Sequence, residues 1–270
     1  MWATLAIATA LSLAPNADKL KITNARATTG ILGNERKSDK YLPGDIYFLA
    51  FDIEGLTVSE EGKIGYSIGL ELKDSTGAAV YKQRPQNMEA VNSLGGTSLP
   101  AFAKVEIGLK TPAGLTTLTI EVTDLKSKQS VTLVRKFTVL KKGFGIVRLG
   151  LSYDYDLTLP APPLFVPGQQ LIVTFFVAGF ERDKEKNPNL VLKMTVKDDK
   201  GQATLKKPPV GEVKSAPANN LMLPLQFRLD LNRPGKYKIV LEAEDKNGKK
   251  KATESVEITV VEQTTGKKGD

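Results

Sequence analysis

The sequence predicts an all-β protein built from two tandem β-sandwich domains of about seven strands each. Three observations lead to this prediction. Apolar and polar residues alternate in short runs, turn residues separate the runs, and the whole pattern occurs twice. The stretch YLPGDIYFLAFDIEGL from Tyr41 recurs as FVPGQQLIVTFFVAGF from Phe165, and apolar residues hold matching places in both.

The repeat covers most of the chain. A shift of 124 residues aligns Asp74 with Asp198, and a later three-residue deletion changes the shift to 121, which aligns Asp124 with Asp245. A period near 120 residues is the size of an independent domain. We therefore expect four parts: a signal segment at 1–17, a first sandwich at 18–142, a second sandwich at 143–262 and a flexible basic tail at 263–270.

Each predicted strand follows from local alternation and from the turns that bound it. In KYKIVLEAED, Tyr237, Ile239 and Leu241 share one face, as in a strand with one buried side. LIVTFFVAGF is apolar almost throughout, which predicts a strand covered on both faces or a domain contact. In the first copy the expected strands lie at roughly 20–27, 45–54, 64–73, 78–83, 101–109, 116–123 and 129–140, and the second set follows 121 to 124 residues later.

The turns have specific expected geometries. Pro43-Gly44 and Pro167-Gly168 should each form a turn that starts a core strand, with Pro fixing φ and Gly accepting a positive φ. Phe51 and Phe175 would then be core residues. Asn247-Gly248 in DKNG should supply the positive φ angles of a tight hairpin.

These turns and strand patterns, YLPGD, LKDSTG and PGKYKIVLEAEDKNG, resemble those of bacterial immunoglobulin-like modules of exported proteins, in particular the macroglobulin type. The resemblance implies an immunoglobulin-like fold and transfers no functional residue. The thioester of protease-trapping macroglobulins requires Cys, which the chain lacks. Tyr237 fits the tyrosine-corner position of such folds, where the first copy has Thr116.

The composition excludes several chemistries. The chain has no His and no Cys, which removes His-dependent triads, thiol nucleophiles and the usual zinc sites. Dinucleotide-binding and phosphate-binding Gly loops are also absent from the sequence, so we expect no cofactor. The net charge of +8 is divided evenly, about +4 in each half, which does not favour nucleic-acid binding.

Carboxylates are the remaining candidates for chemistry. A glycoside hydrolase needs only two of them, but the adjacent acidic pairs fall mainly in turns or on strand faces, where solvated charge is expected. Asp154 and Asp156 would share one side of a strand and could bind Ca²⁺ with a third oxygen donor. The acidic pairs considered were Glu60-Glu61, Asp154/Asp156, Asp198-Asp199 and Glu242/Glu244.

The start of the chain resembles a secretory signal. An apolar run from Trp2 to Leu13 is followed by small residues, although no basic residue precedes the run. A first strand or a short membrane anchor is the alternative. No other stretch is long and apolar enough to span a bilayer. We expect a secreted, periplasmic or envelope-associated protein.

The expected function is non-catalytic: a binding or spacer module that acts by surface recognition. The alternatives are an inhibitor or chaperone-like protein that binds a partner by a strand edge, and a carboxylate-only glycoside hydrolase. The partner would be an unknown protein or an anionic envelope polymer, and no oligomeric state is implied. The candidate contact residues lie where the second copy differs most from the first, in its lysine-rich hairpin and its 153–164 segment: Lys246, Lys249, Lys250, Lys251, Tyr153 and Tyr155.

Overall fold

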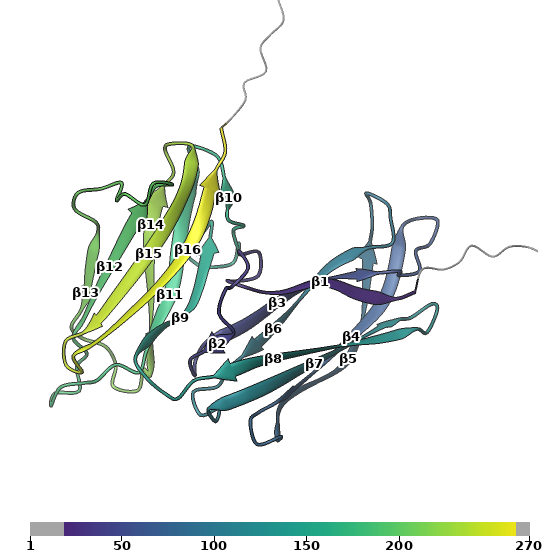
Figure 1. The fold of residues 1–270 in the computed structure, drawn as a ribbon, viewed down its shortest axis with the longest axis horizontal. Coiled ribbons are helices and arrows are strands. Elements are labelled where there is room, and N and C mark those ends of the chain that lie inside the picture. The colour runs from purple at the N-terminus through teal and green to yellow at the C-terminus, as the bar shows by residue number, and fades with distance from the viewer. Residues whose placement is uncertain (1–18, 263–270) are drawn as a thin grey trace, which may run out of the picture.

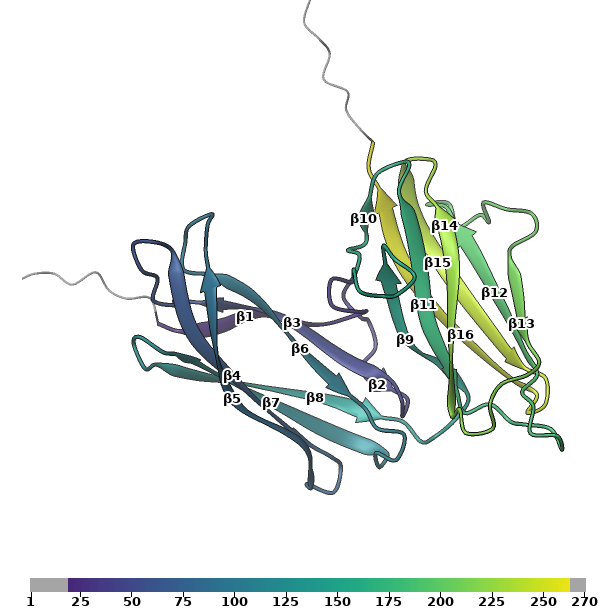
Figure 2. The ribbon, with the colours of Figure 1, turned by 180° about the vertical axis from the view of Figure 1, so that it is seen from behind.

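The computed structural model describes residues 19–262, which fold into two β-sandwiches that meet at an angle (Figures 1 and 2). The expected signal segment at 1–17 and tail at 263–270 lie outside the described residues. Residues 19–262 contain no helix long and apolar enough to cross a membrane. The all-β prediction is confirmed, and each unit pairs a three-stranded sheet with a five-stranded sheet.

The first sandwich contains a sheet of order β1-β3-β6 and a sheet of order β2-β8-β7-β4-β5. All neighbours are antiparallel except β2, which runs parallel to β8. The bounds are β1 (Lys21–Thr28), β2 (Lys40–Tyr41), β3 (Ile46–Glu54), β4 (Lys63–Lys73), β5 (Ala79–Val91), β6 (Leu99–Glu106), β7 (Gly114–Asp124) and β8 (Ser130–Val139).

The second sandwich repeats this arrangement strand for strand, with sheets β9-β11-β14 and β10-β16-β15-β12-β13. Residues 140–144 connect the two units. The bounds are β9 (Gly145–Ser152), β10 (Leu164–Phe165), β11 (Gln170–Ala178), β12 (Leu190–Lys197), β13 (Val210–Val213), β14 (Met222–Asp230), β15 (Gly235–Asp245) and β16 (Lys250–Val260).

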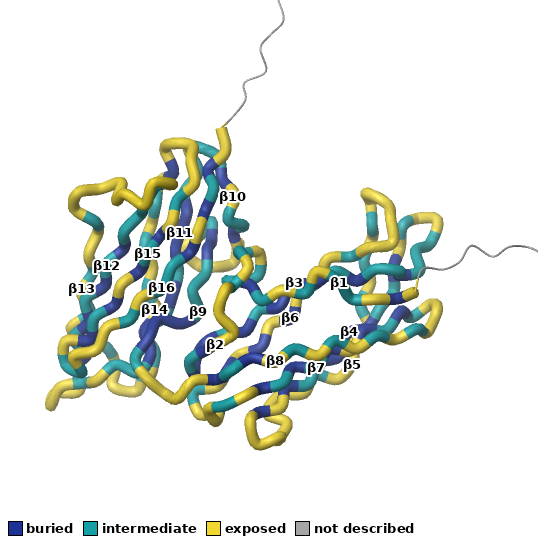
Figure 3. Tube along the Cα trace, in the orientation of Figure 1, coloured by how far each residue is buried: buried dark blue, intermediate teal, exposed yellow. Residues whose placement is uncertain are grey.

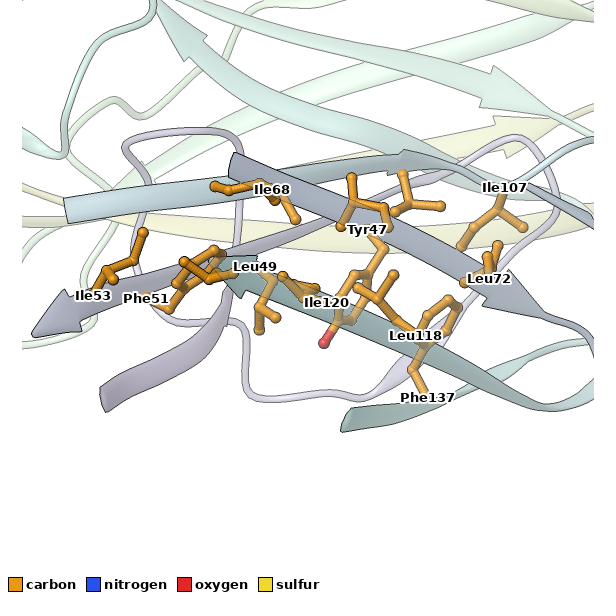
Figure 4. Packing of buried hydrophobic residues seen from close by; sticks show 14 of the residues in the cluster. Tyr47, Leu49, Phe51, Ile53, Ile68, Leu72, Ile107, Leu118, Ile120 and Phe137 are labelled. Carbon is orange, nitrogen blue, oxygen red and sulfur yellow. The ribbon is translucent and has the colours of Figure 1, made fainter. Parts of the chain in front are cut away.

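Each sandwich has its own core between its two sheets. Burial alternates along the strands, while loops and hairpin tips are exposed (Figure 3). Phe51 and Phe175 are 1% exposed, which confirms both as core residues. In the first core, rings and branched aliphatic side chains from facing strands interdigitate; Figure 4 labels Tyr47, Leu49, Phe51, Ile53, Ile68, Leu72, Ile107, Leu118, Ile120 and Phe137.

The repeated Pro-Gly stretch forms the expected turn in both copies. Gly44 has φ 96° and Gly168 has φ 92°, and the N–H of Asp45 donates to the carbonyl of Leu42 at 3.0 Å. These angles suit a type II turn. The stretch recurs because each sandwich needs the same turn to start its central strand, β3 or β11.

Strand β11 is covered on both faces, as its continuous apolar sequence predicts. Its inward side chains belong to the second core, whereas Ile172 and Ala178 are also buried but lie outside that core. Thr174 and Phe176 on this outer face line a cleft together with Ile46 and Phe48 of the first sandwich. The outer face of β11 therefore takes part in positioning the two sandwiches.

Two local predictions were wrong. The 245–250 hairpin does not place positive φ at Asn247-Gly248: the left-handed residue is Lys249, with φ 52°, and Lys128 holds the aligned place in the first copy with φ 61°. A four-residue hairpin loop that begins with a right-handed turn needs its residue of positive φ at the last loop position. Gly248 instead provides room, because a Cβ there would lie 2.5 Å from a carboxylate oxygen of Asp245.

The second wrong prediction concerns the strand expected near 202–207. The structure has no regular strand there, and β13 starts at Val210 and pairs only with residues 190–193 of β12. Its counterpart β5 pairs with the full length of β4. Pro208-Pro209 explains part of the difference, because proline cannot donate a hydrogen bond to a β-ladder.

Candidate functional site

The lysine-rich hairpin tip lies at the end of the β15–β16 ribbon and rests on the loop at 181–189. Asp245 is fully buried beneath it and accepts hydrogen bonds from the N–H groups of Glu181 and Asn247. The Asn247 amide donates to the carbonyls of Glu181 and Asn187, each at 3.2 Å. The tip therefore has a defined shape set by buried polar contacts.

Most of the charge of this tip is locally neutralised. Lys246 pairs with Glu244 at 2.8 Å, Lys250 pairs with Glu181 at 2.7 Å, and Lys251 lies 3.9 Å from Glu244. Within residues 19–262, Lys249 is the member of this group that makes no ion pair. The tip presents a mixed-charge surface in which one lysine is free to meet an anion.

The 153–164 segment leaves the end of β9 as a loop. Tyr153 packs edge-on against Phe165, with ring centroids 5.9 Å apart. Tyr155 is half exposed, and its hydroxyl helps to raise the pKa of Arg228, after the larger effect of the Asp230 hydrogen bond. Of the two tyrosines, Tyr155 offers more surface to a partner.

The two candidate regions lie at opposite ends of the second sandwich (Figure 1). Asp245 is paired with Lys250 at one end of β16, and Leu164 is paired with Thr259 at the other. Nine residues of strand separate these ends by about 30 Å. One small partner cannot contact both regions at once.

The expectation that Asp154 and Asp156 share a strand face is wrong, because β9 ends at Ser152. Both residues lie in the following loop. The Asp154 carboxylate accepts hydrogen bonds from the Ser152 and Thr158 hydroxyls and from the N–H groups of Thr158 and Leu159. The Ser152 and Thr158 bonds hold the pKa of Asp154 well below its usual range. Its oxygens are thus engaged in shaping the loop.

In each of the other acidic pairs at least one member is engaged in a similar way. The Ser59 hydroxyl donates to Glu61, Asp198 accepts N–H groups in its own turn, Glu242 pairs with Lys193 and Glu244 pairs with Lys246. Among residues 19–262, no three acidic side chains gather in a way that could hold a metal ion.

The junction between the sandwiches contains the most elaborate polar cluster, and sequence reasoning missed it. Asp45, buried at the start of β3, accepts a 2.7 Å hydrogen bond from the N–H of Arg148 in the second sandwich. It also pairs with Arg36 at 2.9 Å. The Arg148 Nε donates to the carbonyl of Gly44 at 2.7 Å. One carboxylate thus ties the inter-strand loop of the first sandwich to the first strand of the second.

Arg148 reaches this position because it occupies a β-bulge. Its φ is 55°, and the β9–β11 register shifts at the same point. Asn24, the aligned residue of the first copy, has φ 51° and also sits at a register shift. The replacement of a bulge Asn by Arg was the sequence signal that could have revealed the junction.

Apolar contacts and close approaches complete the junction. A Cβ on Gly44 would lie 2.5 Å from the Met222 sulfur, and one on Gly145 would overlap the Leu42 side chain. Val147 is buried outside the second core. The sandwiches therefore pack tightly against each other around the Asp45 cluster.

A second acidic residue borders the same junction. Glu254 on β16 lines a cleft of about 430 Å³ together with Arg36, Asp45 and Arg148. Burial raises the pKa of Glu254, the Arg36 guanidinium lowers it by a smaller amount, and Asp45 raises it further. The raised pKa of Glu254 therefore reflects mainly its burial at the edge of the junction.

No family model matches the chain, and no curated protein matches it in sequence. Similar solved structures include the C-terminal domain of the AgI/II polypeptide BspA of Streptococcus agalactiae, 10% identical over 89% of this chain and 100% of that one, TM-score 0.31. The C-terminal domain of the Streptococcus pyogenes antigen I/II-family protein AspA is 8% identical over 89% and 99%, TM-score 0.30.

Red sea bream transglutaminase is 7% identical over 91% of this chain, TM-score 0.29, and this chain spans 32% of its length. TM-scores near 0.3 are too low to establish a shared topology.

Proposed function

We propose that the chain is a non-catalytic recognition or spacer module, exported or envelope-associated, that acts through its surface. The observation that carries this proposal is the junction. Arg148 of the second sandwich bonds to Asp45 and Gly44 of the first, and a junction held in this way keeps the loops of the two sandwiches at fixed positions relative to each other. A fixed spacing suits a protein that presents a binding surface at a distance.

The engagement of the acidic side chains supports a non-catalytic role over hydrolysis by carboxylates. A glycosidase needs one carboxyl with a raised pKa facing a second across a substrate cleft. The lowered pKa values of Asp74 and Asp154 come with hydrogen bonds inside their own turn and loop, and that of Asp124 with hydrogen bonds from Thr57 and from its own turn. Glu254 has a raised pKa, but the charged groups that act on it are Arg36 and Asp45 of the junction.

Binding by a strand edge is a second candidate, for which β5 is the longest exposed edge. Its thirteen residues pair with β4 on one side only. Lys82, Arg84 and Pro85 lie along it, and such residues discourage uncontrolled strand addition. If the chain binds by the β5 edge, we therefore expect a selective partner whose charges are complementary to Lys82 and Arg84.

The surface-recognition proposal can be tested with dextran sulfate as a polyanion probe, by measuring binding across a range of salt concentrations. We expect salt-sensitive binding that decreases when three lysines of the hairpin tip are replaced by Ser. The replacements should leave the fold intact, since exposed tip residues contribute less than about 0.5 kcal/mol each. The replaced residues are Lys249, Lys250 and Lys251.

A matched control replaces Lys126 and Lys128 by Ser at the aligned hairpin of the first sandwich. Equal losses in both variants would point to general charge and contradict a site at the second tip. Unchanged binding in the tip variant, with the same salt dependence, would also contradict it. Hydrolysis of a glycoside panel by the purified chain would overturn the non-catalytic proposal itself.

A further inference from the structure

We propose that the second sandwich binds a small aliphatic anion in an apolar cleft at one end of its core. The cleft has a volume of about 480 Å³, within the range of small-molecule sites. It opens between the two sheets, beneath the segment at 204–209. Its apolar walls come from β12, β14, β16 and the residue after β14: Met194, Val196, Leu229, Ile258, Val260 and Leu231.

The first sandwich is closed at the aligned place, which shows that the opening is a specific feature of the second copy. Leu72 and Val105 are 2% and 1% exposed. Their counterparts Val196 and Leu229 are only half-buried. A sandwich whose core is accessible at one end offers apolar surface that a ligand can cover.

Changes in the core explain the opening. In the first copy, Phe137 stacks on Tyr47 with ring centroids 4.3 Å apart, and Tyr41 packs edge-on against both rings (Tyr47 and Phe137 are labelled in Figure 4). The aligned residues of the second copy are Phe165, Leu171 and Ile258. Two of three aromatic rings are replaced by smaller aliphatic side chains, of which Ile258 lines the cleft, while Tyr237 takes the place of Thr116 and lines the cleft beside Arg233.

The missing strand exposes the same region. Strand β13 covers β12 only as far as Lys193, so the irregular 204–209 segment borders the rest. The Met194 N–H already donates to the carbonyl of Pro209 at 3.1 Å, and the carbonyl of Val196 accepts from the Thr204 N–H at 2.9 Å. Because these edge groups are used, the site favours a small ligand over an added peptide strand.

The rim favours an anionic head group. Arg233 lines the mouth and donates from Nε to the Tyr237 hydroxyl at 3.2 Å. Lys206 and Lys207 follow Leu205 on the bordering segment, and within residues 19–262 none of these three cations is in an ion pair. Asp198 and Asp199 act on Arg233 from nearby, so the positive balance is modest.

The guanidinium at the mouth and the apolar walls behind it match the two parts of one ligand. A carboxylate head could pair with Arg233, while its aliphatic chain enters between the sheets beside Met194 and Val196. The chemistry that fits is therefore a medium-chain fatty carboxylate.

The test titrates the full chain with decanoate, octanoate and decyltrimethylammonium, followed by calorimetry and by amide NMR shifts. Each buried methylene strengthens binding about fourfold, so decanoate should bind about 15-fold more tightly than octanoate. Decyltrimethylammonium, with the same chain and opposite charge, should bind more weakly than decanoate. The largest shifts should fall at 194–196, 204–209 and 228–233.

Two pairs of variants locate the site. Leu205→Asp should weaken decanoate binding at least tenfold, whereas Leu221→Asp, an equally exposed leucine at the far end of β14, should leave it unchanged. Arg233→Gln should weaken decanoate binding and remove the preference over the ammonium probe, and Arg233→Lys should retain it. Equal affinity for octanoate and decanoate, equal effects of the two Asp variants, or shifts centred elsewhere would each overturn the proposal.

Discussion

Replacement of Asp45 by Ala should both destabilise the chain and loosen the two sandwiches. The substitution removes a buried acceptor that serves the N–H groups of Ile46 and Arg148 and the guanidinium of Arg36. Loss of one partner of a buried ion pair costs about 3–5 kcal/mol. The Arg36 side chain is 20% exposed and can be rehydrated, so we expect about 2–3 kcal/mol.

The matched control is Gln169→Ala, at the aligned position of the second sandwich. The Gln169 side chain accepts only the N–H of Val166 in its own turn, at 2.9 Å. Loss of this one bond should cost about 1 kcal/mol. The difference between the two variants therefore isolates the contribution of the junction.

The assay combines urea unfolding with a distance measurement between spin labels. The chain has no Cys, so Gln86→Cys and Gln226→Cys place one label in each sandwich without background. Both glutamines are exposed on strands. We expect a narrow distance distribution in the parent and in Gln169→Ala, and a broad one in Asp45→Ala. Equal destabilisation by both variants, with three narrow distributions, would refute the claim that Asp45 fixes the arrangement.

Three further predictions follow from the same contacts. Tyr237→Phe should cost about 1 kcal/mol, because the Tyr237 hydroxyl donates to backbone carbonyls of Arg233 and Pro234. Thr116→Val should maintain or raise stability, since the buried Thr116 hydroxyl has no hydrogen-bond partner in the described part of the chain. Thermal unfolding distinguishes the two variants. Asp245→Ala should cost about 3 kcal/mol in urea unfolding by unpairing buried N–H groups, against under about 1 kcal/mol for the exposed-turn variant Asp198→Ala. The pKa of Glu254 is raised in the folded state, so between the unfolded and folded pKa values the folded chain holds a proton that the unfolded chain has lost. The free energy of unfolding should therefore fall as the pH rises from the unfolded pKa toward the folded pKa. Glu254→Gln should remove this decline, which is measured by unfolding from about pH 4 to 7.

The fold was predictable because its strongest signals are local and occur twice. The Pro-Gly turn at Gly44 and Gly168 requires a positive φ that Gly adopts freely. Asp124 and Asp245, which are aligned in the repeat, have the same structural role. Each carboxylate connects its own hairpin to the segment that follows the central strand, at Thr57 or at Glu181. Strand alternation then placed Phe51 and Phe175 in the cores.

The junction and the open cleft could not be predicted in the same way. Both depend on segments far apart in sequence, such as Arg148 and Asp45, which are hydrogen-bonded, or Val196 and Ile258, which line one cleft. Alternation indicates which face is buried but not what covers it. The expected strand near 202–207 failed for a related reason: its counterpart extends through Pro85 at an irregular register, and the second copy does not repeat that pairing.

Comparison of the two bulges explains how a duplicated sandwich acquired an inter-domain contact. In the first copy, the Asn24 amide donates to Asp52 on the neighbouring strand at 2.7 Å. In the second, the aligned pair is Arg148 and Phe176, with the guanidinium 5.4 Å from the ring centroid. The ring supports the arginine without using its N–H groups, so these are free to reach Gly44.

The acceptor turn differs between the copies in the complementary way. Asp45 carries a negative charge into the junction, whereas Gln169 at the aligned position uses its side chain to close its own turn. Asp45 accepts the backbone N–H of Arg148, while the Arg148 guanidinium donates to the Gly44 carbonyl and lies 3.4 Å from Glu106. The same backbone framework, a turn before the central strand and a bulge in the first strand, therefore gives a junction where the turn carboxylate accepts a backbone N–H of the second sandwich and the bulge side chain is long enough to reach the turn. Asp45→Gln combined with Arg148→Asn should accordingly leave two folded sandwiches whose relative orientation is no longer fixed.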